Sequence, residues 1–137
     1  VLPLVVFDGI AHAIAPDIVP KEAAFCRIKG AAEERCRDLA GGDCPPAIGV
    51  MFYDTKSRFM TPAVYVAATD SLVFESSCGS GAAALAAWKT AAAGDGEHLL
   101  DVEQPGGVIA VRVRRQDGEI AGISIGGPVK LSGRIAV

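Results

Sequence analysis

The chain has 137 residues, of which 50% are hydrophobic and 21% charged, and its mean hydropathy is +0.35. A chain of this length buries about 68% of the surface that it exposes when unfolded, so we expect one compact domain over residues 1–137. The 13 basic and 16 acidic residues give a net charge of −3, which excludes intrinsic disorder and argues against a nucleic-acid partner. No apolar stretch reaches the roughly 20 residues that span a bilayer, and no basic leader precedes Val1. We therefore expect a soluble, cytoplasmic protein without a membrane partner.

The cysteine pattern favours reduced thiols over disulfide bonds or a metal site. A domain of this size folds without disulfide bonds, although four cysteines could pair on count alone. They are Cys26, Cys36, Cys44 and Cys78. A structural zinc site usually has two ligands within a few residues of each other, and no two cysteines here are so close. His12 and His98 are also far apart in the sequence, so no metal site is predicted.

The first forty residues are predicted to form two strands and a helix. Apolar residues dominate the stretch 1–15 and are interrupted at Asp8-Gly9, which indicates two short strands across a bend. Over residues 21–40 the apolar side chains recur close to every 3.6 positions, which is typical of an amphipathic surface helix. We expect Gly41-Gly42 to end this helix and Cys36, on its apolar face, to fill the core.

Strands are predicted to dominate the rest of the chain. Runs rich in Val, Ile, Phe and Tyr alternate with turn residues. The expected strands cover residues 47–53, 58–67, 71–74, 99–103, 108–114 and 119–125. Arg112 and Arg114 alternate with Val111 and Val113, as in a half-buried sheet, so we interpret these two arginines and Arg115 as a solvated face.

A second helix is predicted after the segment Glu75–Gly81. Residues 82–93 are mostly alanine, which has the highest helix propensity, and the preceding serines and glycines suit a helix start. The helix is apolar nearly all round up to Trp88, so other elements should enclose it. The sequence therefore predicts an α+β fold in which a mainly antiparallel sheet is rolled around a central helix that begins near Cys78.

Cys78 is the strongest candidate for a reactive residue. Free N–H groups and the helix dipole stabilise an anion at a helix N-terminus, so we expect the pKa of this thiol to lie below about 8.5. The N–H groups of Gly79, Ser80 and Gly81 could hold a substrate carboxylate, since glycine lets a ligand approach the backbone. An ordinary glycine-rich helix start with an inert, buried cysteine accounts for the same residues equally well.

Several motifs resemble one enzyme superfamily. The segment Glu75-Ser76-Ser77-Cys78-Gly79-Ser80-Gly81, His12 after a strand and a bend, and Gly127-Pro128-Val129 with Gly133 resemble the second half of the diaminopimelate epimerase superfamily. A closer resemblance, to the histidine racemases of opine-type metallophore biosynthesis, covers most of the chain from Ile48 onward. The segments that carry it are Ile48-Gly49-Val50-Met51-Phe52-Tyr53-Asp54, Phe59 through Pro62 to Tyr65, Ser71-Leu72 and Gln104-Pro105-Gly106-Gly107.

This resemblance implies an activity. The family uses neither pyridoxal phosphate nor a metal, and its two pseudo-symmetric domains, each a sheet rolled around a helix, face each other with one cysteine apiece. It implies a cofactor-independent amino-acid racemase or epimerase in which Cys78 is the catalytic cysteine of the second, C-terminal half. The second cysteine would come from a missing N-terminal half or from a second copy of the domain, so the isolated chain is expected to be inactive.

Departures from the epimerase pattern bear on the substrate. Diaminopimelate epimerases have asparagines where this chain has Ile10 and Gly49, and an arginine where it has Ser76. The resemblance therefore implies a small-molecule substrate that is an amino acid other than diaminopimelate, with histidine as the candidate.

The roles of the neighbouring residues stay open. Glu75 and His12 are candidates for orienting the substrate ammonium group or tuning Cys78, and a His12 that is merely hydrogen-bonded in a strand bend is an equally good interpretation. Ser77 is expected to cap the helix first and to contact substrate second. Two other functions remain open: a non-catalytic carboxylate-binding domain, and acyl transfer by Cys78 with His12 within hydrogen-bond distance as its base.

Overall fold

The computed structural model describes residues 1–40, 43–130, 133 and 136. Along the chain its elements are β1 (Leu4–Phe7), β2 (Ile10–Pro16), α1 (Glu22–Ala40), β3 (Ala47–Asp54), β4 (Phe59–Val66), the 3₁₀ turn η1 (Ala67–Thr69), β5 (Ser71–Phe74), α2 (Gly79–Lys89), β6 (Gly96–Gln104), β7 (Gly107–Gln116) and β8 (Glu119–Gly126). Every predicted strand and both predicted helices are thereby confirmed. The helix stop expected at Gly41-Gly42 lies outside the described residues.

The strands form one mixed sheet. Its order is β1-β2-β3-β4-β6-β7-β8, and β5 pairs with β4 beside this path. Two contacts are parallel: β2 with β3, and β4 with β6 through the single pair Phe59 and Glu103. All other strand pairs are antiparallel, so the predicted sheet type is confirmed. The parallel pair β2 and β3 needs a crossover connection, and α1 provides it.

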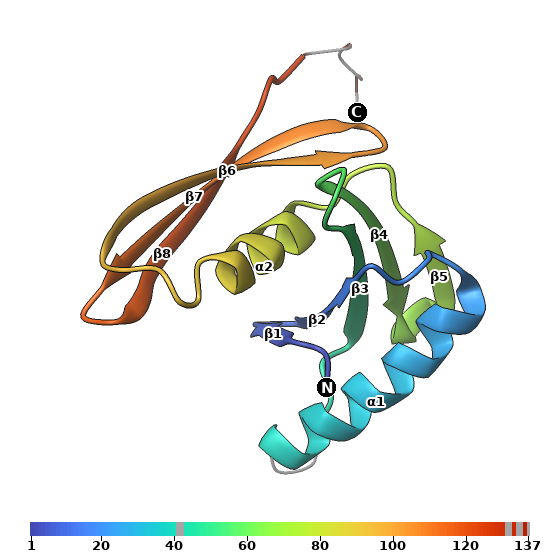
Figure 1. Ribbon diagram of the computed structural model, residues 1–137. Coiled ribbons are helices and arrows are strands. Elements are labelled where there is room, and N and C mark those ends of the chain that lie inside the picture. Colours follow the sequence, from blue (N-terminus) through green and yellow to red (C-terminus); the bar gives the residue numbers. More distant parts are fainter. Residues whose placement is uncertain (41–42, 131–132, 134–135, 137) are drawn as a thin grey trace.

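Helix α2 lies inside the curve of this sheet. Figure 1 shows β6, β7 and β8 passing along one side of the helix and β2 and β3 along the other. The helix contacts β1, β2, β3, β7 and β8, and all residues from Gly81 to Ala87 are buried. Because alanine side chains are short, strands can approach the helix from several sides. The prediction of a sheet rolled around a central helix is confirmed.

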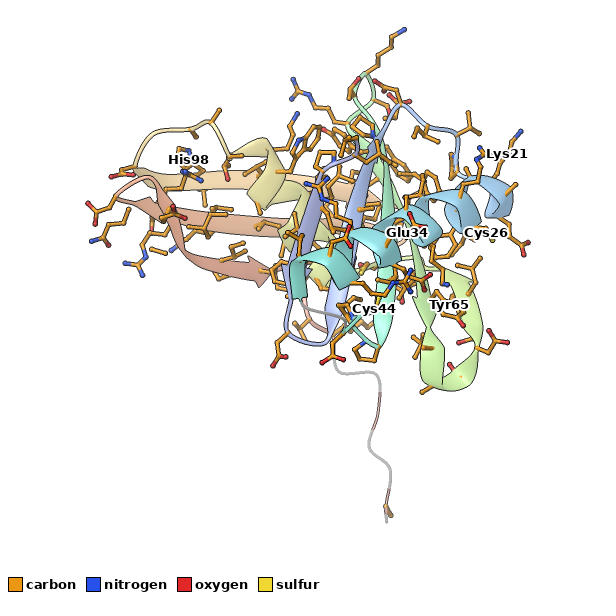
Figure 2. All side chains as sticks on the ribbon, turned by 90° about the horizontal axis from the view of Figure 1, so that it is seen from below. Lys21, Cys26, Glu34, Cys44, Tyr65 and His98 are labelled. Atoms are coloured by element: carbon orange, nitrogen blue, oxygen red, sulfur yellow. The ribbon has the colours of Figure 1, made fainter. Side chains whose placement is uncertain are left out.

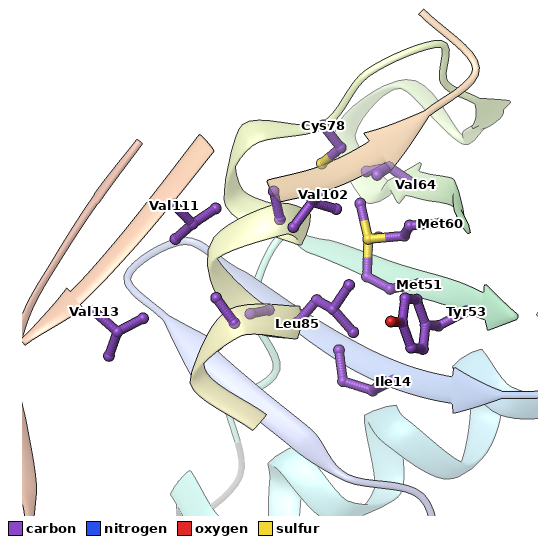
Figure 3. Close-up of a cluster of buried hydrophobic side chains, with 13 residues drawn as sticks. Ile14, Met51, Tyr53, Met60, Val64, Cys78, Leu85, Val102, Val111 and Val113 are labelled. Carbon is purple, nitrogen blue, oxygen red and sulfur yellow. The ribbon is translucent and has the colours of Figure 1, made fainter. Parts of the chain in front are cut away.

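Strand β3 separates two parts of the core. Successive side chains of a strand point to opposite faces. Met51 and Tyr53 pack in the cluster around α2, which Figure 3 shows, whereas Val50 and Phe52 pack with residues of α1 on the other face. Both faces of β3 are therefore covered, one by each helix.

The alternation on β2 follows the same rule with one unusual residue. Ala11, Ala13 and Ala15 belong to the clusters on the α1 side, whereas Ile14 belongs to the cluster on the α2 side. His12 shares the face of Ile14, and its side chain is 0% exposed. A buried imidazole ring therefore lies on the face of β2 that packs against α2.

Helix α2 ends earlier than predicted. It stops at Lys89 rather than continuing through Ala93, and Thr90 follows as its C-terminal cap. The Thr90 hydroxyl donates a hydrogen bond to the carbonyl oxygen of Ala86 at 2.8 Å, and the Ala93 N–H donates to the Thr90 carbonyl oxygen at 2.9 Å. These bonds close a turn where alanine propensity alone predicted more helix.

The arginines of β7 differ from the prediction at one position. Arg112 and Arg114 are exposed, as expected, but Arg115 is 8% exposed. Its guanidinium group donates to the carbonyl oxygen of Gly118 in the turn before β8. Val111, Val113 and Arg115 occupy alternate positions of β7, and all three point inward. The prediction that Arg115 lies on a solvated face is therefore wrong.

The cysteines on and after α1 lie away from α2. Cys36 is buried on the apolar face of α1, as predicted, and Cys44 packs against its cluster. Figure 2 shows Cys26 on the same helix and Cys44 in the segment beyond it.

No helix in the described part of the chain is long and apolar enough to cross a membrane.

Candidate functional site

Cys78 itself caps the N-terminus of α2. Its backbone is extended, with φ −135° and ψ 110°, and its Sγ accepts a hydrogen bond from the Gly81 N–H at 3.4 Å. Its carbonyl oxygen accepts from the Ala82 N–H at 3.0 Å and so begins the helical pattern. Ser77 is exposed and precedes the cap, so the prediction that Ser77 caps the helix is wrong.

Two backbone N–H groups at this helix start have no acceptor in the described part of the chain. The first residues of a helix cannot donate to a carbonyl group of the preceding turn. Gly81 donates to Cys78 Sγ, but the N–H groups of Gly79 and Ser80 have no hydrogen-bond partner among the described residues. Such groups attract an anion. The structure therefore leaves two of the three predicted donors for a carboxylate.

Packing explains the two glycines at this helix start. A Cβ on Gly81 would lie 2.2 Å from the Met51 sulfur, and a Cβ on Gly79 would lie 2.8 Å from Ile125 Cδ1. A larger residue at position 81 would displace the buried Met51, and one at position 79 would displace the exposed Ile125 side chain. The glycines therefore allow α2 to sit against β3 and β8, and these close contacts explain the missing side chains without a ligand.

Burial controls the acidity of Cys78. The residue is 7% exposed, and burial raises the pKa of its thiol above the ordinary value. The hydrogen bonds from Ser80 and from the Gly81 N–H lower this pKa, but the burial effect is larger, and the Glu75 carboxylate raises the pKa further. The expectation of a pKa below about 8.5 is therefore wrong for this chain, because desolvation outweighs the helix terminus.

His12 reaches Cys78 through Ser80. Its Nε2 lies 2.9 Å from Ser80 Oγ, and Ser80 Oγ lies 3.6 Å from Cys78 Sγ. No direct hydrogen bond joins His12 to Cys78 in the described part of the chain. Burial lowers the pKa of His12 to about 4, so the ring is neutral at pH 7. The acyl-transfer hypothesis required Cys78 and His12 within hydrogen-bond distance of each other, and among the described residues Ser80 lies between them instead.

Sequence reasoning missed Gln104, which holds the backbone of Cys78. Its Oε1 accepts a hydrogen bond from the Cys78 N–H at 2.7 Å, and its side chain is 2% exposed. In the following turn the Gly106 N–H donates to the Ser76 carbonyl oxygen at 2.6 Å. The signal was available: Val102 and Gln104 occupy the inward positions of β6, where a glutamine needs a partner.

The predicted substrate residues fall into a contiguous segment and one distant strand. Glu75 to Gly81 follow β5 and begin α2, and His12 comes from β2. The main cavities on the described residues are lined by side chains other than Cys78. Within the same residues, no three or more His, Cys, Asp or Glu side chains lie close enough together to hold a metal ion.

Comparison with curated proteins finds histidine racemases. The histidine racemase of Staphylococcus aureus is 29% identical over 98 residues, which make up 72% of this chain and 36% of that protein. A histidine racemase of Fusobacterium nucleatum is 38% identical over 84 residues, which make up 61% of this chain and 30% of that protein. The chain thus spans about a third of the length of the curated relatives that it matches.

Comparison with solved structures supports the fold. The crystal structure of a methylitaconate-delta-isomerase superposes with a TM-score of 0.51 at 14% identity, covering 95% of this chain and 65% of that one. This likeness concerns the fold alone. It agrees with the diaminopimelate epimerase-like architecture expected from the sequence.

A family model spans nearly the whole chain. The model described as "Histidine racemase CntK N-terminal domain" matches residues 2–135. Its description names the N-terminal domain, which differs from the second half that the sequence resemblance suggested. Because the match extends from one end of the described fold to the other, the chain belongs to the family of histidine racemase N-terminal domains.

Proposed function

We propose that this chain supplies one of the two catalytic cysteines of a cofactor-independent amino-acid racemase, and that Cys78 is this cysteine. The observation that carries the proposal is the start of α2, where the Cys78 thiol lies beside two N–H groups that have no acceptor among the described residues. A carboxylate bound to Gly79 and Ser80 would bring the adjacent Cα of an amino acid close to that sulfur. Membership of the racemase family supports the same assignment.

The reaction needs one acid and one base on opposite faces of Cα. A thiolate removes the Cα proton, and the electron pair left on Cα spreads onto the carboxylate. The two helix N–H groups stabilise this charge, as oxyanion donors do in other enzymes. A thiol on the other face then gives its proton to Cα, which inverts the centre and leaves a thiolate there. The two sulfurs exchange protonation states, so the reverse reaction uses the same groups in opposite roles.

The raised pKa of Cys78 fits an acid and base that must work in both directions. A thiol that ionised fully at neutral pH could remove a proton but could not return one. Burial keeps a large share of Cys78 protonated, and the donors Ser80 and Gly81 keep the thiolate accessible. We assign Glu75, whose carboxylate acts on the Cys78 pKa, as the group that receives the substrate ammonium ion.

The second cysteine must come from outside this chain. The matched family model is an N-terminal domain, so we place the complementary thiol in a C-terminal half rather than in the N-terminal half suggested by the sequence. A second copy of this domain facing the first is the other arrangement that supplies two thiols. The names of the curated relatives make histidine the substrate that we propose.

Hydrogen exchange at Cα tests this function. The chain is joined to the C-terminal region of a histidine racemase relative and incubated with L-histidine in deuterium oxide without added cofactor. We expect deuterium at Cα and formation of D-histidine, whereas the isolated chain should show little of either. Cys78→Ser should reduce both by orders of magnitude, since a serine hydroxyl is a far weaker acid than a thiol.

Cys26→Ser is the matched control, because Cys26 is exposed on α1 and should leave the rate unchanged. A Cys78→Ser variant that racemises histidine near the parent rate would refute the assignment. Saturable binding of histidine with no exchange in any combination would instead favour a carboxylate-binding domain.

A further inference from the structure

His12 is a polar side chain in an apolar part of the core. Its ring is 0% exposed and lies edge-on to Phe7, with the ring centroids 6.1 Å apart. Nε2 faces Ser80, whereas Nδ1 has no hydrogen-bond partner among the described residues. A buried imidazole that meets only half of its hydrogen-bonding needs is unfavourable for folding. Its single polar contact therefore calls for an explanation.

Gly49 makes the space that His12 occupies. The two residues are paired across the parallel strands β2 and β3. A Cβ on Gly49 would lie 2.1 Å from His12 Nδ1 and 2.7 Å from its Cε1, too close for any side chain to be accepted without moving the ring. The sequence thus combines a histidine with the one residue that admits it.

The unpartnered Nδ1 indicates where the ring proton lies. A neutral imidazole carries one N–H, and the low pKa of His12 keeps the ring neutral. A proton on Nδ1 would be a buried donor with no acceptor, which is rarer in proteins than an unused lone pair. With the proton on Nε2, the ring donates to Ser80 Oγ at 2.9 Å. The Ser80 hydroxyl proton is then free to point elsewhere.

Cys78 Sγ is the acceptor within reach of that hydroxyl. Ser80 Oγ lies 3.6 Å from it, a hydrogen-bond distance for sulfur. We infer that His12 and Ser80 form a directed hydrogen-bond chain, Nε2–H to Oγ and O–H to Sγ, which stabilises the Cys78 thiolate. Ser80 touches the reactive sulfur, and His12 is a positioning residue that acts through Ser80. The inference rests on the proposed function only in giving that thiolate a catalytic role.

The other groups around Cys78 do not replace this donor. The Gly81 N–H also donates to Sγ, whereas the Glu75 carboxylate opposes the thiolate. In the core around α2, Cys78 belongs to the same apolar cluster as Met51 and Val102. The hydrogen bond from Ser80 is the largest of the effects that lower the pKa of this thiol.

The experiment measures Cys78 alone. The intact chain is alkylated with iodoacetamide at a series of pH values, and mass spectrometry follows each cysteine separately. We expect Ser80→Ala to move the midpoint of the Cys78 profile upward by roughly one pH unit, since a hydrogen bond to a charged group is lost. His12→Met should move it upward by less, and His12→Gln, which keeps an N–H donor, should restore part of the shift.

Two controls distinguish the loss of the hydrogen bond from Ser80 to Cys78 from a general change in structure. Ser77→Ala removes an exposed neighbouring hydroxyl that makes no hydrogen bond with Sγ among the described residues, so the midpoint should not move. The profile of Cys36, far from Ser80, should be the same in every variant. A Ser80→Ala midpoint equal to or below that of the parent overturns the inference. Unchanged midpoints in both His12 variants show that His12 does not position the Ser80 hydroxyl.

Neither outcome depends on racemisation. A shifted Cys78 profile together with no Cα exchange in the joined protein would reject the proposed function and leave the hydrogen-bond chain standing. Cα exchange in the joined protein, together with an unchanged Cys78 profile in Ser80→Ala, would support the proposed function and reject the hydrogen-bond chain.

Discussion

The two helices of this domain are built for different surroundings. Helix α1 alternates apolar and charged positions and covers one face of β2 and β3, whereas α2 is buried from Gly81 to Ala87 and lies inside the sheet. Each helix carries one buried cysteine, Cys36 on α1 and Cys78 on α2. Burial raises the pKa of both thiols. Only Cys78 lies at a helix start with a hydroxyl and a backbone N–H directed at its sulfur, so position rather than burial makes the two thiols different.

The largest effect should come from shortening a leucine of the enclosed helix. Leu85 on α2 is 2% exposed, whereas Leu39 on α1 is 70% exposed. Leu85→Ala should lower the free energy of unfolding by about 2–5 kcal/mol, because it leaves a cavity between α2 and the sheet. Leu39→Ala should change it by less than about 0.5 kcal/mol.

Urea unfolding followed by circular dichroism gives both values. The pair is matched, since the same atoms are removed from one helix and then from the other. Equal losses would mean that α2 is not enclosed as the fold requires.

Acid should destabilise the α2 side of the domain through His12. The unfolded chain binds a proton at this residue near pH 6.5, but the folded chain binds it only near pH 4. Between these values the unfolded state holds more protons, so the free energy of unfolding falls as the pH is lowered. The full shift corresponds to about 3 kcal/mol, present above pH 6.5 and lost as the pH falls to about 4.

Unfolding curves at several pH values test this effect. His12→Gln should remove the slope between pH 6.5 and 4. His98→Gln should retain it, since that ring lies at the start of β6 and bonds the Gly94 carbonyl oxygen. The carboxyls of Asp54 and Asp95, whose pKa values backbone N–H groups hold below the usual range, titrate at lower pH. A parent protein as stable at pH 4.5 as at pH 7 would show that His12 is not buried in neutral form.

Local patterns were sufficient to predict most of the elements. The alternation in β7, the 3.6-residue period of α1 and the alanine-rich run of α2 each depend on neighbours in sequence. The position of Cys78 at the start of α2 followed from serine and glycine in the same way. Such patterns also located the buried position of Cys36.

The features that the sequence did not predict depend on contacts between distant segments. The sequence predicted the wrong direction for the Cys78 pKa, because helix termini are visible in a sequence but the burial of this sulfur depends on Met51 and β6. The contact of His12 with Ser80 spans 68 positions and that of Gln104 with Cys78 spans 26. Neither pair leaves a local pattern. The expected strand ends at residue 103, so Gln104 falls outside it, although β6 extends to Gln104 and turns its side chain inward.

The smallest effect should come from Gln104, which ties the start of α2 to β6. Gln104→Leu removes the acceptor of the Cys78 N–H, and a buried donor without a partner is unfavourable. The change also removes Nε2, which has no partner among the described residues, and this gain offsets part of the loss. We therefore expect a net loss of about 1 kcal/mol in the free energy of unfolding.

Gln116→Leu is the control for this change, because Gln116 ends β7 and is exposed, so its loss should be near zero. Amide hydrogen exchange separates a local from a general effect. In Gln104→Leu the Cys78 and Gly106 amides should exchange faster, since both connect the segment before α2 to the turn between β6 and β7. The amides of α1 should exchange as in the parent, because that helix packs against β2 and β3. If the Cys78 amide stayed as protected as in the parent, another acceptor would hold the helix start, and Gln104 would be a core residue without a role at the site.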